Sequence, residues 1–240
     1  MALLTTYAQT THAQTAYAAD AAPNPWLSWS YLRDNSDAIL VAGRQHVILT
    51  VETVLIAVVV AFPLALLARQ LRPLATPILG LSGALYTIPS LAMFAFLEPF
   101  VGLNERTVLI GLVVYALVIL VRNFLVGLQG VPPDVREAAR GMGYGPARML
   151  WRVELPIAMP AMMAGVRIAT VSTVALVTVG VVVGNGGLGQ IIFEGFNNNF
   201  YRAEIVTGSL LCVALALVAD GLLAGVTRLL APWSRTRSAT

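Results

Sequence analysis

Long apolar stretches alternate with short polar ones along most of the chain. Five of the apolar stretches reach the roughly 20 residues that a helix needs to cross the apolar part of a bilayer. They lie at about 47–68, 77–99, 107–128, 157–183 and 205–230. The gaps are too short for a soluble domain, so the pattern predicts an all-α membrane protein of about five transmembrane helices. We expect a transmembrane domain at 46–231 and a short tail at 232–240, with Pro89 kinking the second helix.

The first 45 residues do not share this pattern. They are rich in Ala, Thr and Gln and turn amphipathic around NPWLSWSYLRDNSDAIL. They lack the basic region and the continuous apolar stretch of a cleaved signal peptide. Trp26, Trp29 and Tyr31 suit a helix at the level of the lipid headgroups. We therefore expect residues 1–45 to form a retained extracytoplasmic tail with an interfacial helix, with a loosely ordered tail as the alternative.

Composition supports a membrane protein and limits its chemistry. Hydrophobic residues make up 58% of the chain and charged residues 11%, with a mean hydropathy of +0.78, which is outside the usual range of soluble domains. All 15 basic residues are Arg, so the chain cannot carry the lysine of a phosphate-binding loop. Any ATP that drives the protein therefore has to bind another subunit. The only thiol and imidazoles are those of Cys212, His12 and His46, so we expect no catalytic residue, metal site or internal disulfide.

The arginines also predict how the chain is oriented, because basic residues are retained on the cytoplasmic side of a membrane. With the N-terminus outside, nine arginines fall on inner connections: Arg69, Arg72, Arg136, Arg140, Arg148, Arg152, Arg228, Arg235 and Arg237. Four fall on outer segments: Arg33, Arg44, Arg106 and Arg202. The sequence therefore predicts a multi-pass protein of the cell membrane, with the N-terminus outside, the C-terminus in the cytoplasm and a cytoplasmic loop at 132–156.

This loop is unusually polar for the chain. Its two opening prolines are expected to end one helix and begin the next, which three glycines then interrupt. Pro146 suits the first turn of a second short helix. Small Ala138 and Ala139 are expected to lie beside exposed apolar side chains. These apolar residues are Met142, Tyr144, Met149 and Trp151. The pattern predicts a docking element.

A fixed spacing of residues runs through the same loop. It consists of Glu-Ala-Ala, three residues, Gly, nine residues, a branched apolar residue, any residue and Leu-Pro. In this chain the fixed positions are Glu137, Ala138, Ala139, Gly143, Val153, Leu155 and Pro156. The pattern resembles the cytoplasmic loop of binding-protein-dependent ABC importer permeases, in which Ile is more usual than Val at the branched position. The resemblance implies a coupling helix that sits in a cleft of a separate ATPase subunit, which binds ATP and Mg²⁺. A basic loop held only by lipid headgroups is the alternative.

Two further segments narrow the resemblance. HVILTVETVLIAVVVAFPLALLAR is similar to the first span of this family. VGNGGLGQIIFEG is similar to the Gly-Ala-Gly-Gly-Leu-Gly segment of osmoprotectant uptake permeases, with Asn185 in place of Ala. The resemblance covers about residues 44–230. It implies the five-span core that methionine importer permeases share, and import of a quaternary ammonium solute such as glycine betaine, choline or carnitine. Import of methionine or another small solute is the alternative.

Partners are expected on two grounds. Five helices can hardly enclose a solute pathway without exposing it to lipid, so a second permease copy or a paralogue is expected. A stripe of small residues in the fourth span allows close helix contact, either within the chain or between chains. The stripe consists of Ala161, Gly165, Ala169 and Thr173. The resemblance adds ATPase subunits and an extracytoplasmic solute-binding protein. Membrane lipid is expected around the chain, and nucleic acid is not an expected partner.

Two intramembrane features are further candidate sites. Arg167 and Asp220 are each expected at a depth of about 15 Å, where an unpaired charge is costly. We expect them to form an ion pair, either for helix packing or for solute contact, with Arg122 as a competing partner for Asp220. The second feature is a candidate outer gate or binding-protein surface, which could equally end the fourth helix: Gly184, Asn185, Gly186, Gly187 and Gly189.

Two other classes of protein fit the sequence less well. A secondary carrier needs groups that bind a coupling ion and, in many folds, two inverted halves, but no internal repeat is found. An intramembrane enzyme needs a nucleophile with its base, or metal ligands. Neither His46 nor Cys212 has an evident catalytic companion along the sequence.

Overall fold

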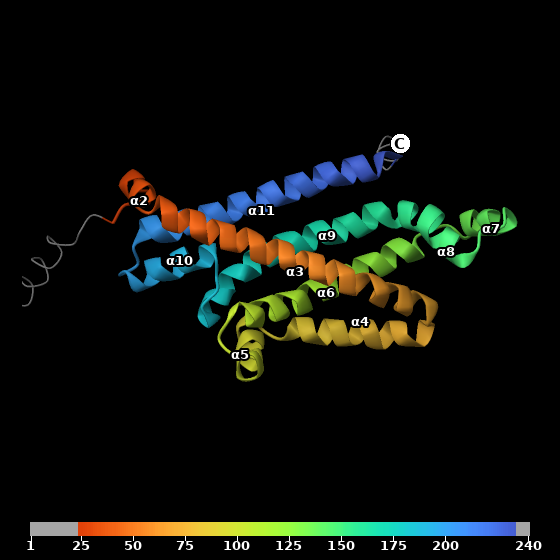
Figure 1. Cartoon of the computed structure of the whole chain (residues 1–240), viewed down its shortest axis with the longest axis horizontal. Helices are drawn as coiled ribbons and strands as arrows, with labels where there is room; N and C mark the ends of the chain where they lie inside the picture. The colour runs from red at the N-terminus through yellow and green to blue at the C-terminus, as the bar shows by residue number, and fades with distance from the viewer. Residues whose placement is uncertain (1–23, 234–240) are drawn as a thin grey trace, which may run out of the picture.

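The computed structural model describes residues 24–233, and all of their regular secondary structure is helical (Figure 1). The α-helices are α2 (Trp29–Asp34), α3 (Ser36–Gln70), α4 (Arg72–Thr87), α5 (Ser90–Val101), α6 (Glu105–Gln129), α7 (Pro133–Gly141), α8 (Pro146–Met149), α9 (Leu155–Val177), α10 (Leu188–Asn197) and α11 (Arg202–Leu230). Two further helical turns are the π-helical η1 (Leu150–Glu154) and the 3₁₀-helical η2 (Thr178–Val183). The expectation of an all-α fold is confirmed.

Within residues 24–233, four helical segments are long and apolar enough to cross a membrane: Ser36–Gln70, Glu105–Gln129, Pro146–Val183 and Arg202–Leu230. The segment expected as the second span is instead broken into α4 and α5, which are bent by 98° relative to each other. A simple kink at Pro89 was therefore the wrong expectation. A residue before proline avoids the helical conformation, and Ile88 is extended with φ −67° and ψ 125°. The helix consequently ends and a new one begins.

Helix α6, the third expected span, stabilises the break between α4 and α5. An unpaired peptide group is costly in an apolar environment, so the exposed carbonyl at the bend needs a partner. The hydroxyl of Tyr115 on α6 donates a hydrogen bond to the carbonyl oxygen of Ile88 at 2.5 Å. The ring of Tyr86 on α4 packs edge to face on Tyr115, with ring centroids 5.9 Å apart. The position of α6 thus stabilises the bend between α4 and α5.

The core lies where α3, α6 and α9 pack together. On the buried face of α3 the side chains are small: Ala57, Ala61, Ala65 and Ala68. Larger side chains of α6 fill the space opposite, among them Leu120, Phe124 and Leu128. Small residues at a spacing of about four form one face of a helix and let a neighbouring backbone approach closely.

The small-residue stripe of α9 also packs within the chain. A Cβ on Gly165 would lie 2.4 Å from the Cβ of Asn123 on α6, so this glycine lets the two helices touch. Ala169 and Thr173, farther along the stripe, are buried. Of the two uses that the sequence left open for the stripe, the structure shows contact within the chain.

The last helix lies at the edge of the bundle (blue in Figure 1). It contacts α9 and α10, and none of the residues in its most apolar 18-residue window is buried. Its exposed apolar side chains include Leu210, Val213, Leu217, Val218 and Leu222. An apolar surface of this extent requires cover from lipid or from another protein chain.

The segment before the first span contacts residues near the start of α11. Asn24 donates a hydrogen bond to the turn after α10 at 3.0 Å and accepts one from the backbone N–H of Arg202 at 2.8 Å. The guanidinium group of Arg202 lies 4.8 Å from the ring centre of Trp26. Residues 24–34 therefore pack beside the start of α11.

The two expected domain boundaries lie differently relative to the helices, since α11 ends at Leu230, next to the boundary expected after residue 231, whereas the N-terminal boundary lies within a helix. Helix α2 occupies the place of the expected interfacial helix, and the side chain of Trp29 is exposed. The first long helix begins at Ser36, so the boundary expected between residues 45 and 46 lies inside a helix. The rest of the predicted N-terminal tail and most of the predicted C-terminal tail, including Arg235 and Arg237, lie outside the described residues.

Candidate functional site

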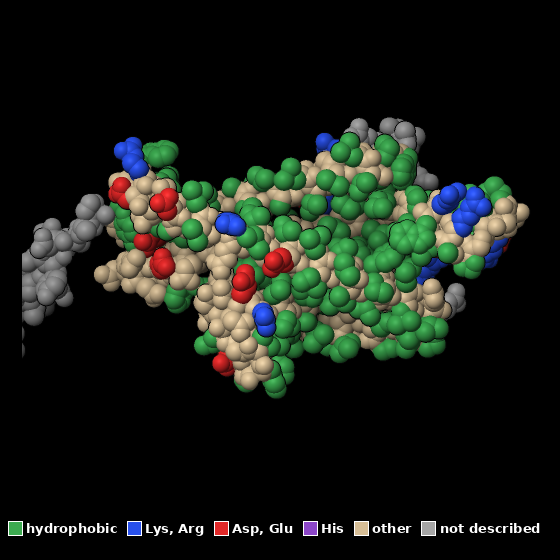
Figure 2. All heavy atoms as spheres, in the orientation of Figure 1, with side chains coloured by type: hydrophobic (Ala, Val, Ile, Leu, Met, Phe, Trp, Pro, Cys, Tyr) green, Lys and Arg blue, Asp and Glu red, His purple; other side chains and the backbone are tan. Residues whose placement is uncertain are grey.

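A short helix projects from one end of the molecule. Helix α7 lies beyond the ends of the long helices, at the right of Figure 1. It begins with Pro133 in its first turn, where no backbone N–H is needed, and with Asp134 near the positive end of the helix. Basic side chains gather at the same end of the molecule in Figure 2. The exposed arginines of this region are Arg140, Arg148 and Arg152.

Gly143 ends α7 in a Schellman motif. The N–H of Gly143 donates to the carbonyl of Arg140 at 2.9 Å, and the N–H of Tyr144 donates to the carbonyl of Ala139 at 3.1 Å. Gly143 has φ +78°, a left-handed conformation that glycine adopts without strain. A Cβ there would meet nothing within 4 Å. The glycine is therefore required for the backbone angle and not for space.

Only part of the predicted motif faces outward. Glu137 and Ala138 are exposed, as is Met142 at 68%. Ala139 and Met149 are buried, at 2% and 7% exposure. The expectation that both belong to the outer surface was wrong, because the turn reverses the chain and brings α8 against α7.

Two other apolar residues of the loop are also placed by the structure. Tyr144 is half-buried beneath the guanidinium group of Arg148, which lies 4.5 Å from its ring centre. Trp151 is exposed, but its ring packs beside Phe62 of α3 with centroids 6.3 Å apart. The outward apolar surface of the loop is therefore smaller than the sequence predicted.

The second short helix expected in the loop is the beginning of the fourth span. Helix α8, the π-helical turn η1 and α9 follow one another without a gap. Leu155 N–H bonds back to Leu150 O across the wider π-helical turn, and Pro156 has no N–H to donate. Leu155 is buried and Pro156 is half-buried. The Leu-Pro end of the motif thus anchors the loop to the core.

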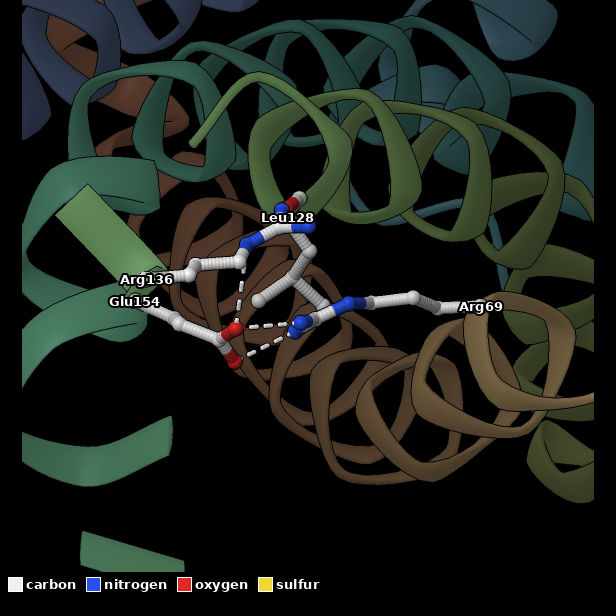
Figure 3. Close-up of polar contacts among 4 residues, drawn as sticks. All are labelled: Arg69, Leu128, Arg136 and Glu154. Carbon is white, nitrogen blue, oxygen red and sulfur yellow. Dashed lines mark hydrogen bonds and ion pairs between the residues drawn. The ribbon is translucent and has the colours of Figure 1, made fainter. Parts of the chain in front are cut away.

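A buried carboxylate that the sequence did not single out lies between an arginine of α3 and an arginine of α7 (Figure 3). Glu154 accepts two hydrogen bonds from Arg69 of α3, one of them from Nη1 to Oε2 at 2.5 Å. Arg136 of α7 approaches from the other side, with its Nε 3.3 Å from Oε1, a charge contact without an aligned hydrogen bond. The Nη2 of Arg136 also donates to the carbonyl of Leu128 at the end of α6, at 2.9 Å. We call Arg69, Arg136 and Glu154 the arginine clamp.

The arginine clamp lines a cavity of about 1020 Å³ between the ends of the helices. Arg140, Tyr144 and Gln129 also face this cavity. The side chain of Glu154 is 5% exposed, and those of Arg69 and Arg136 are 21% and 24% exposed. Removing one partner from a buried ion pair typically costs about 3–5 kcal/mol. The contacts of Glu154 therefore contribute strongly to the position of the loop.

Arg167 of α9 and Asp220 of α11 are in contact. Arg167 donates two hydrogen bonds to the carboxylate, from Nε to Oδ1 at 2.8 Å and from Nη2 to Oδ2 at 2.7 Å. Their side chains are 37% and 36% exposed and lie beside a cavity of about 410 Å³. Arg122, the competing partner considered above, is exposed on α6. The expected ion pair is present, and it joins α11 to the rest of the bundle.

The glycine run forms a tight turn between η2 and α10. Gly184 and Gly187 have positive φ angles of +86° and +52°. A Cβ on Gly186 would lie 2.6 Å from Val181, and one on Gly189 would lie 2.4 Å from the carbonyl oxygen of Thr178. The run thus combines a tight turn with close backbone approach, as its composition predicted. Its use as an outer gate stays a prediction.

Buried His46 links this turn to the first and fourth spans. One ring nitrogen, Nε2, lies 2.9 Å from the carbonyl oxygen of Val174, and Nδ1 accepts a hydrogen bond from the N–H of Leu188 at 3.2 Å. Nearby, Gln45 donates to the side-chain oxygen of Asn185 at 3.0 Å. Both ring nitrogens of His46 are thus used by the backbone, which makes the imidazole a structural link. Sequence reasoning missed this role, although a lone histidine in an apolar helix was a signal for it.

Among the residues that the structure describes, no cluster of His, Cys, Asp and Glu is arranged to hold a metal ion. A family model described as the inner membrane component of binding-protein-dependent transport systems matches residues 53–236. The chain belongs to this family. The match includes the whole predicted coupling motif and the arginine clamp.

Several transport permeases are similar to this permease over most of their length. A carnitine transport permease of Listeria monocytogenes is 34% identical over 192 residues, 80% of this chain and 87% of the relative. A choline transport system permease of Bacillus subtilis (strain 168) is 34% identical, over 84% of this chain and 93% of the relative. An osmoprotectant import permease of Salmonella typhimurium (strain LT2) is 33% identical, over 84% of this chain and 96% of the relative.

Solved structures confirm the fold of the permease. An inward-facing structure of the methionine ABC transporter MetNI matches with a TM-score of 0.73 and 21% identity, over 80% of this chain and 95% of that chain. A structure of an amino acid ABC transporter matches with a TM-score of 0.69 and 18% identity, over 84% and 98%. The expected methionine-importer-like core is therefore confirmed, and the protein is a non-catalytic permease subunit of an ABC transporter.

Proposed function

We propose that this permease forms the membrane pathway of an ATP-driven importer for a quaternary ammonium osmoprotectant. The support for the solute class comes from relatives named for carnitine, choline and osmoprotectant transport, each similar over at least 80% of this chain. The likeness to the methionine transporter is at 21% identity and supports the fold alone. A quaternary ammonium solute is therefore favoured over methionine.

The observation that carries the coupling role is the projecting helix α7. It presents exposed Glu137, Ala138 and Met142 at a basic end of the molecule, and a Schellman turn at Gly143 fixes its direction. Such a helix can enter a cleft on another protein, and the surrounding arginines favour an acidic partner surface. In our proposal the partner is an ATPase subunit that binds ATP and Mg²⁺ in the cytoplasm. Ala139 is the buried residue of α7 itself, and Leu155 and Pro156 join the loop to the core at the start of α9.

The opposite end then faces outward in the cytoplasmic membrane. This orientation puts the N-terminus and the glycine run, Gly184 to Gly189, on the side that receives solute from a binding protein. A second permease, identical or paralogous, covers the face formed by α9 and α11. The exposed apolar side chains of α11 and the half-exposed pair of Arg167 and Asp220 support such cover.

The test is to express the permease with candidate ATPase and binding-protein subunits, and to reconstitute the purified complex in lipid. The complex is expected to hydrolyse ATP faster when glycine betaine, choline or carnitine is present with the binding protein, and not when methionine is. The permease alone is expected to hydrolyse no ATP. Failure of any ATPase to co-purify, or turnover by the isolated chain, would overturn the proposal.

A further inference from the structure

Glu154 connects the packed core helices to α7, which packs little against them. Its carboxylate meets Arg69 at the end of α3 and Arg136 in the middle of α7, while Glu154 itself belongs to the helical segment that continues into α9. The Nη2 of Arg136 adds a bond to Leu128 near the end of α6. The three helices of the core and the projecting helix thus meet at one pair of guanidinium groups and one carboxylate.

Helix α7 has few other links to the core. It packs mainly against α8 and η1, the two turns that follow it in the chain. Its outer residues Glu137 and Ala138 are exposed, and Arg136 is its polar link to α3, through Glu154, and to α6. The arginine clamp is therefore the polar contact through which a displacement of α7 reaches α3, since α7 itself packs little against α3.

The two arginine side chains of the clamp border open space. The cavity of about 1020 Å³ opens beside the clamp, so the two arginine side chains are not enclosed by a packed core. Arg69 binds both carboxylate oxygens, whereas Arg136 makes a looser contact at 3.3 Å. The tighter contact holds α3 to the segment that continues into the fourth span, and the contact at 3.3 Å attaches α7 to the same carboxylate.

We propose that Glu154 is the positioning residue that couples α7 to the membrane helices: its carboxylate holds Arg69 and Arg136 so that displacement of α7 moves the ends of α3 and α9 together. This inference rests on the proposed function, since the displacement comes from a partner ATPase. Glu154 lies between Val153 and Leu155, at the position of the coupling motif that any residue can occupy. The motif itself therefore does not assign this role to Glu154.

The test uses the complete complex of permease, ATPase and binding protein in lipid. Glu154→Gln removes the negative charge with little change in size, and Arg136→Gln detaches α7 while the pair of Arg69 and Glu154 stays intact. Both variants are expected to bind the ATPase and to keep the basal ATPase rate. Solute-stimulated ATPase activity and transport are expected to fall at least about fivefold, the lower range of coupling between linked sites. The double variant is expected to be no worse than Glu154→Gln alone, because both changes break one connection.

Asp134→Asn is the matched control, since it neutralises an exposed carboxylate on the same helix and is expected to transport normally. Normal transport by Arg136→Gln, or losses that add in the double variant, would overturn the inference. Loss of the ATPase from both variants would overturn it as well, because the clamp would then only fold the docking surface. Arg136→Gln decides the question if Glu154→Gln does not reach the membrane. If the unchanged permease binds no ATPase, the proposed function fails first.

Discussion

Within residues 24–233, two groups of paired charges differ in burial and in the number of partners. At the basic end, Glu154 is almost fully buried and meets two arginines from two other helices. In the middle of the bundle, Arg167 and Asp220 form a two-membered pair that is about one-third exposed. The first group joins the projecting helix to the core, and the second joins the outlying α11 to α9. The difference shows that similar ion contacts join several helices around one buried carboxylate in one place and join two helices at a partly exposed interface in the other.

The strongest test of this difference is to exchange charges in both groups. The double variant Arg69→Glu with Glu154→Arg restores one pair but puts a guanidinium group at position 154 against Arg136. Like charges with little solvent around them are costly, so we expect the exchange to destabilise the protein by more than about 3 kcal/mol. The amount of protein in the membrane fraction and its thermal unfolding in detergent measure this effect. A fully stable exchange variant would show that Arg136 is not part of the group.

The pair of Arg167 and Asp220 should behave differently. Arg167→Gln and Asp220→Asn each leave one charge within the expected span, and we expect transport to fall by at least about tenfold. Arg167→Asp with Asp220→Arg is expected to recover part of the loss, since no third charged group among residues 24–233 forms a salt bridge with the pair. Solute uptake into proteoliposomes measures both results. Equal damage in the single and exchanged variants would argue against a role that depends on pairing.

Neighbouring residues of α7 provide a third comparison. Arg136 points to Glu154, whereas Glu137 is exposed. Glu137→Lys and Gly143→Val are therefore expected to leave the membrane level of the protein nearly unchanged while ATPase binding and transport are lost. In the glycine variant, a branched side chain at φ +78° costs about 1–3 kcal/mol and redirects the turn. Co-purification of the ATPase measures the effect, and Asp134→Asn serves as the control.

The smallest effect is expected at Arg140, which lies four residues after Arg136 but is exposed. Arg140→Gln should weaken association with the ATPase only about two- to threefold, as is usual for an exposed charge. The difference should disappear at high salt, because mobile ions screen exposed charges. Titration of the ATPase at two salt concentrations measures this. A loss that persists at high salt would place Arg140 in a buried contact with the partner.

The sequence predicted the contact of a charged residue well where that residue lies within an apolar stretch, and poorly where it lies among other charged residues. Arg167 and Asp220 interrupt long apolar stretches, so their depths could be compared and their contact predicted. Glu154 lies among several arginines, and nothing in the order of residues shows which of them faces it. The burial of Ala139 and Met149 was missed for a related reason, since it depends on the direction in which the Schellman turn returns the chain. The helices themselves were predicted well because hydrophobic length is a local property, whereas the 98° bend after Ile88 depends on tertiary contacts.

The hydrogen bond from Tyr115 to Ile88 has a consequence for biogenesis. The segment of α4 and α5 leaves the ribosome before α6, so the carbonyl at the bend has no partner from α6 when the segment first meets the translocon. The bent hairpin is then completed only after the next helix has entered the bilayer. In a chain truncated before α6, α4 and α5 are expected not to reach the 98° bend of the complete structure. Cysteine crosslinking between α4 and α5 in arrested nascent chains of increasing length would show when the bend appears. A bend already present before α6 emerges would exclude this order of assembly.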